Sequence, residues 1–93
     1  MISQVTEGVC AFAWRNYLLL HTGISENDNR RSALYRYVTD LRHTAEYDFE
    51  LLQVAAVAYL KKLDEWHDDR AARLAADQAL AECLESRRAQ VDT

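Results

Sequence analysis

The chain lacks proline and contains only two glycines, Gly8 and Gly23, among its 93 residues. Proline breaks helices because it has no amide hydrogen, and glycine weakens them through its conformational entropy. Alanine, leucine, arginine and glutamate, which favour helices, are abundant. Hydrophobic residues make up 49% of the chain, which is too much for a disordered protein. The composition therefore predicts one all-α domain at the small end of the usual size range.

An excess of basic residues is also missing. The formal net charge is −4, so the chain is repelled on average by nucleic acid and by anionic membranes. The N-terminus lacks the basic region and the small-residue cleavage site of a signal peptide. The longest apolar stretch, residues 9–20, is interrupted by Arg15 and Asn16 and is too short to span a bilayer. We expect a cytoplasmic protein with no membrane partner.

Cysteine is scarce, and the motifs of common enzymes are absent. Cys10 and Cys83 both lie in apolar helical surroundings, so we expect two reduced, buried thiols. The sequence has no cysteine pair at metal-ligand spacing, no glycine-rich phosphate loop and no nucleophile elbow. We therefore expect a non-enzymatic protein that needs no cofactor.

Four helices are predicted, at about residues 4–21, 26–43, 47–65 and 68–88. Ser3 and Ser25 are suitable N-caps for the first two, and Gly23 follows the end of the first. Thr44 or Asp48 is the only start signal for the third helix. The stretch "DEWHDD" at residues 64–69 has no strong breaker, so the sequence also allows one continuous helix from the third segment into the fourth.

The helices differ in how their apolar residues are distributed. The second has one apolar stripe, whereas the first and third are apolar nearly all round, as in "LLQVAAVAYL" at residues 51–60. A helix that is apolar on every side must be covered on every side. A compact bundle of three or four helices has too few partners for two such helices, so we expect a homodimer. The alternative is that another protein covers the same surface.

The fourth helix is rich in alanine, and small side chains allow close helix packing. Leu74, Ala81 and Leu84, with Leu80 alongside, form a narrow apolar stripe between charged positions. This pattern fits a peripheral helix or a helix that pairs with a partner.

Large aromatic and aliphatic residues of the first and third helices are the candidate interface, because aromatic residues are enriched at contact centres. The candidates are Phe12, Trp14, Tyr17, Leu18, Tyr59 and Trp66. The same six residues fit equally well as the core of a single chain, and the sequence leaves both interpretations open.

A nucleic-acid-associated regulator is the alternative function, based on the segment "RRSALYRYVTDLRH" at residues 30–43. Its candidate contact residues are Arg30, Arg31, Tyr35, Arg36 and Arg42. The arginines do not form one continuous stripe on a helical wheel, and acidic residues flank the segment. Arg31 and Tyr35, four residues apart, are expected to form a cation–π pair.

A metal-binding helical bundle is a third, weaker interpretation. Asp64 and His67 have the carboxylate–x–x–histidine spacing of di-metal bundles, and His43 and Glu46 have it in reverse order. Further carboxylates facing a bundle centre are not evident, so we predict no metal site.

Overall fold

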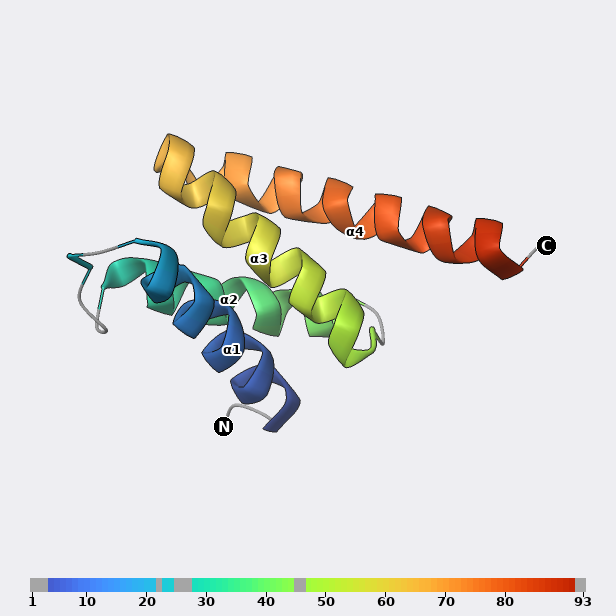
Figure 1. Cartoon of the computed structure of the whole chain (residues 1–93), viewed down its shortest axis with the longest axis horizontal. Coiled ribbons are helices and arrows are strands. Elements are labelled where there is room, and N and C mark those ends of the chain that lie inside the picture. The colour runs from blue at the N-terminus through green and yellow to red at the C-terminus, as the bar shows by residue number, and fades with distance from the viewer. Residues whose placement is uncertain (1–3, 22, 25–27, 45–46, 92–93) are drawn as a thin grey trace.

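The computed structural model describes residues 4–21, 23–24, 28–44 and 47–91, and within these ranges it contains four α-helices and no strand. They are α1 (Gln4–Leu20), α2 (Asn29–Thr44), α3 (Phe49–Trp66) and α4 (Asp69–Val91) (Figure 1). The predicted all-α bundle is confirmed. None of these helices is long and apolar enough to cross a bilayer.

Short aspartate caps set the starts of the later helices. The backbone amide of Arg30 donates to Asp28 Oδ1 at 3.0 Å, immediately before α2. Asp48 is the N-cap of α3, because its side chain accepts the amide of Leu51 at 2.9 Å. The predicted caps Ser3 and Ser25 lie outside the described residues.

The break between α3 and α4 occurs at His67, which adopts the left-handed conformation with φ 51°. Its amide donates to Leu63 O at 2.8 Å and so caps the end of α3. Asp68 then accepts the amide of Arg70 at 3.0 Å and starts α4. The alternative of one continuous helix is therefore wrong, because polar capping groups end α3 where no glycine or proline does.

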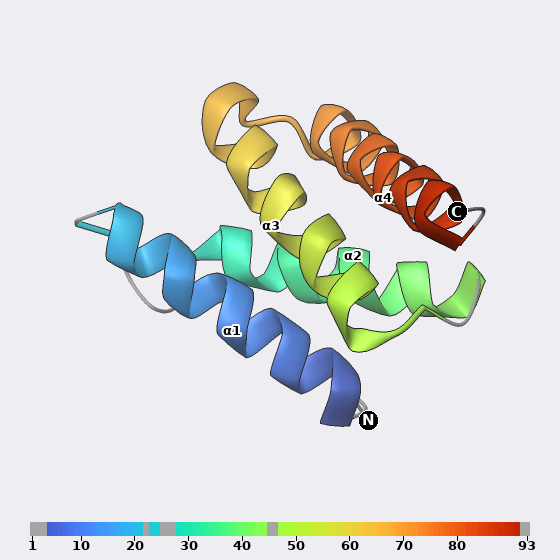
Figure 2. The ribbon, with the colours of Figure 1, turned by 45° about the vertical axis from the view of Figure 1, so that its right-hand side comes forward.

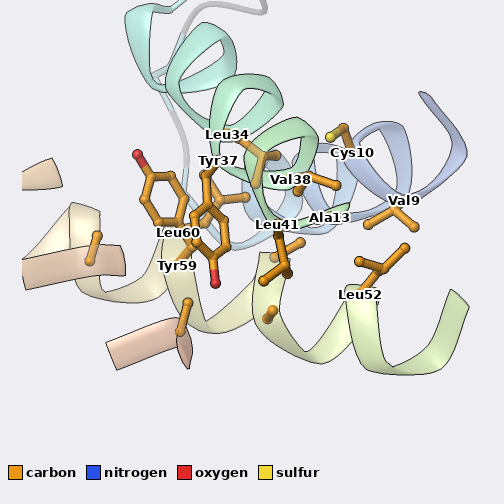
Figure 3. Close-up of a cluster of buried hydrophobic side chains, with 14 of the residues drawn as sticks. Val9, Cys10, Ala13, Leu34, Tyr37, Val38, Leu41, Leu52, Tyr59 and Leu60 are labelled. Atoms are coloured by element: carbon orange, nitrogen blue, oxygen red, sulfur yellow. The ribbon is translucent and has the colours of Figure 1, made fainter. Parts of the chain in front are cut away.

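Helix α3 is the central element of the bundle. It contacts each of the other three helices, and α4 packs mainly on α3. Figures 1 and 2 show α1 and α2 on one side of α3 and α4 on the other. The core between α1, α2 and α3 includes fully buried Val9, Leu34, Val38, Leu52 and Tyr59 (Figure 3).

Helix α4 buries alanine rather than leucine for most of its contact with the bundle. Ala72, Ala76 and Leu80, spaced four residues apart, are at most 4% exposed. Of the predicted apolar stripe, Leu80 is buried in this contact, whereas Leu74 and Leu84 are exposed. α3 also buries two alanines, Ala55 and Ala56. The small side chains of Ala72 and Ala76 favour close packing of α4 on α3.

Candidate interaction surface

Large apolar side chains remain exposed on α1 and α3. Because the buried side of α1 already uses Val9, Cys10, Ala13, Trp14 and Tyr17, its other apolar residues cannot also enter the core. We define the α1–α3 face by the exposed large apolar residues that line hollows between these helices: Phe12, Leu19, Leu20, Phe49 and Val57.

Two hollows run along this face and meet in its middle. The first has a volume of about 670 Å³ and the second about 630 Å³. Val57 and Lys61 line both, so the two mostly apolar hollows adjoin on α3, and we refer to them together as the groove. The first is lined by Ala13, Asn16, Tyr17, Leu19, Leu20, His21, Val57, Leu60, Lys61, Asp64 and Glu65. The second is lined by Phe12, Phe49, Glu50, Gln53, Val54, Val57, Ala58, Lys61 and Ala79.

A polar cluster closes one end of the groove. The Tyr17 hydroxyl donates to Asp64 Oδ1 at 2.7 Å, and Arg30 donates to the same carboxylate at 3.2 Å. Arg30 also donates to the Tyr17 hydroxyl and to Asp28 Oδ1, the latter at 3.0 Å. The His21 ring lies beside that of Tyr17, with centroids 4.5 Å apart and planes tilted by 33°. The cluster joins α1, the start of α2 and the end of α3.

The shifted pKa values of Tyr17 and Asp28 do not suit these two residues to act as general bases at neutral pH. Burial, and then the hydrogen bond to Asp64, raises the pKa of Tyr17 to about 12. The backbone amide of Arg30 lowers the pKa of Asp28. Tyr17 is therefore a protonated hydrogen-bond donor at neutral pH, while Asp28 is an ionised acceptor. A general base would need a pKa near the working pH.

Some buried polar atoms near the groove have no hydrogen-bond partner. These are Nε1 of Trp14 and both amide atoms of Gln53. Buried polar groups are normally paired, because leaving them unpaired costs free energy. Gln53 is half-buried and lines the second hollow.

The six predicted interface residues separate into core and surface. Trp14, Tyr17 and Tyr59 are at most 5% exposed, so the single-chain core interpretation holds for them. Leu18 is partly buried against the core. Phe12 and Trp66 are exposed, and Phe12 lies in the groove. Trp66 lies at the end of α3 with the Lys62 ammonium 5.7 Å from its ring centroid.

The sequence-based list missed Leu19, Leu20, Phe49 and Val57. Leu19 and Leu20 belong to a run of three leucines at residues 18–20, and three consecutive helical positions cannot all face one core. This leucine run was the sequence signal that part of α1 stays exposed. Phe49 and Val57 gave no comparable signal, because which side of α3 stays uncovered depends on where α1 and α4 pack.

The candidate nucleic-acid residues are engaged within the chain to different degrees. Arg30 is held between Asp28 and Asp64. Arg31 lies 5.4 Å from the Tyr35 ring centroid, which confirms the expected cation–π pair. Arg42 donates to Thr6 Oγ1 at 3.1 Å, and Arg36 is exposed. The structure does not bring the four arginines together into one basic patch.

The candidate metal ligands are not brought together either. His43 and His67 are exposed, Asp64 accepts hydrogen bonds from Tyr17 and Arg30, and Glu46 lies outside the described residues. Across the part of the chain that the structure describes, no three His, Cys, Asp or Glu side chains are grouped so that they could hold a metal ion.

Comparison with known proteins does not assign a family. No protein-family model, no curated protein and no solved structure matches the chain.

Proposed function

We propose that this chain is a non-enzymatic interaction module that forms a homodimer through the α1–α3 face. The observation that carries the proposal is the groove of two adjoining, mostly apolar hollows, with the half-exposed rings of Phe12 and Phe49 beside it and Val57 lining both hollows. We also propose a cytoplasmic location, supported by the free thiols of Cys10 and Cys83.

Several large apolar side chains of α1 remain in water. Leu19 and Leu20 are 75% and 79% exposed, and Phe12 is 54% exposed. Moving a fully exposed leucine or phenylalanine out of water contributes about 1.5–3 kcal/mol. Several such residues on one face offset the cost of association, and a closed twofold dimer is the commonest way to cover such a face.

The test is the solution mass, measured by size-exclusion chromatography with light scattering over a range of concentrations. We expect a dimer for the wild type and a monomer for Val57→Asp, because the substitution places a charge in the middle of the groove. The matched control is Leu74→Asp, which adds the same charge at an exposed leucine on α4, away from the groove. This control is expected to remain a dimer.

Two results would contradict the proposal. One is a wild-type chain that stays monomeric at every concentration. The other is a Val57→Asp variant that dimerises as tightly as Leu74→Asp, which would exclude the α1–α3 face as the interface. Circular dichroism of each variant establishes that the helices have formed before the masses are compared.

A further inference from the structure

The exposed side of α3 carries opposite charges at the two ends of an apolar stretch. Glu50, Val54, Val57 and Lys61 are spaced by four, three and four residues. At 3.6 residues per turn, these four positions fall within a strip about 60° wide along the helix. All four line the second hollow. We call these four residues the α3 seam: a carboxylate at one end, two valines in the middle and an ammonium at the other.

The seam is accessible to a partner. Glu50 and Lys61 are exposed, Val57 is 45% exposed and Val54 is partly exposed. The Glu50 side chain keeps 79% exposure even though Arg87 donates to its Oε2 at 3.1 Å. Among the described residues, no carboxylate pairs with Lys61, whereas the neighbouring Lys62 pairs with Glu65 at 3.2 Å. The cation of the seam therefore lacks a counterion within the chain.

We propose that two copies of the chain pair their α3 seams in antiparallel fashion about a twofold axis that passes between residues 55 and 56. In this register Glu50 lies opposite Lys61 of the partner subunit, and Val54 lies opposite the partner's Val57. The twofold axis repeats each contact, so the dimer contains two ion pairs and two valine pairs. The spacing of four, three and four is also that of successive core positions in a coiled coil.

Charge complementarity selects this arrangement over the parallel one. In a parallel pairing Glu50 would face Glu50 of the partner subunit, and Lys61 would face the partner's Lys61. Such like-charge contacts disfavour association, whereas opposite charges fix the register. In the antiparallel register Phe12 and Phe49, which line the same hollow, flank the paired helices and extend the apolar contact.

This inference rests on the proposed homodimer and specifies its register. The test uses Lys61→Glu and Glu50→Lys, each alone and then mixed in equal amounts. In a homodimer of either variant, like charges face each other across the interface at both ends of the seam. In a mixed dimer, Glu at position 61 faces Lys at position 50, and the partner's unchanged Lys61 faces the unchanged Glu50. Both ion pairs are thus restored, with reversed polarity at one end.

We expect each variant alone to dimerise roughly tenfold or more weakly than the wild type, as the summed effect of two exposed ion pairs. The mixture should form a heterodimer close to wild-type affinity, and raising the salt concentration should reduce this preference. Sedimentation velocity measures the masses, and a fluorescent label on one variant identifies the mixed species. The matched control Lys62→Glu makes the same charge change off the seam and should dimerise like the wild type.

The outcomes separate the two proposals. A wild type that is monomeric overturns both the dimer and its register. A dimeric wild type whose two variants show no preference for each other overturns the register and leaves the dimer. Misfolding cannot imitate the expected result, because a misfolded variant would not regain pairing when mixed with the other.

Discussion

The rings of Tyr37 and Tyr59 are stacked, with centroids 4.7 Å apart and planes at 10° to each other. Tyr37 donates its hydroxyl to Asp77 at 2.9 Å, and Tyr59 donates its own to Asp69, so both reach carboxylates on α4. The pair therefore joins α2 to α3 through its rings and both helices to α4 through its hydroxyls. Offset aromatic pairs of this kind contribute beyond their buried area.

Tyr59→Ala should destabilise the chain by about 3–5 kcal/mol, because Tyr59 is fully buried and its removal leaves a large cavity. Tyr59→Phe keeps the ring and loses only the hydrogen bond to Asp69, so about 1 kcal/mol is expected. Urea unfolding followed by circular dichroism measures both. Equal losses for the two variants would contradict the role assigned to the ring.

Ala76→Leu should destabilise the chain by about 1–3 kcal/mol, because Ala76 is fully buried where α4 packs on α3. The matched control is Ala81→Leu on the exposed side of the same helix, with an expected change within about 0.5 kcal/mol. Thermal unfolding compares the two. If Ala81→Leu proved the more damaging, α4 would bury its other face.

His67→Gly should stabilise the chain by roughly 0.5–1 kcal/mol, since a residue with a β-carbon in the left-handed region costs about 1–2 kcal/mol and glycine does not. His67→Val should destabilise it, because β-branched residues tolerate positive φ least. Chemical denaturation of both variants tests the local conformation. A stabilising valine would mean that α3 and α4 are joined differently.

Stability should fall as the pH rises above about 10. Burial, more than any other cause, raises the pKa of Tyr17 to about 12 and also raises the pKa values of Tyr37 and Tyr59. A group whose pKa is raised on folding contributes stability that is complete below its unfolded pKa, here 10.0, and is lost as the pH passes its folded pKa.

The measurement is urea unfolding at a series of alkaline pH values, together with the ultraviolet absorption of tyrosinate. In the native chain tyrosinate should appear at higher pH than in the urea-unfolded chain. Tyr17→Phe removes one of the raised groups and should make the decline in stability less steep. An identical tyrosinate titration for native and unfolded chains would contradict the burial of these hydroxyls.

Local patterns were sufficient to predict the helices. The chain has no proline, only two glycines and many helix-forming residues, so helix is favoured along nearly its whole length. Helix propensity acts over a few residues and can therefore be judged from the sequence. Asp48 was recognisable as an N-cap because capping also depends only on neighbouring residues. The break at His67 was predicted between residues 65 and 68, but one continuous helix stayed open as an alternative, because a left-handed histidine with polar caps around it lacks a glycine or proline signal.

The side of each helix that enters the core was decided by packing between distant segments. From the sequence, Trp14 and Tyr59 were equally suited to an interface or a core, and packing of the neighbouring helices buries both. In α4 the side that enters the core carries Ala72 and Ala76 rather than Leu74 and Leu84, and small side chains favour close packing on α3. The sequence by itself thus determined an all-α chain with two helices apolar on most sides. Only the tertiary structure decided which apolar residues stay in water, since that depends on where every other helix lies.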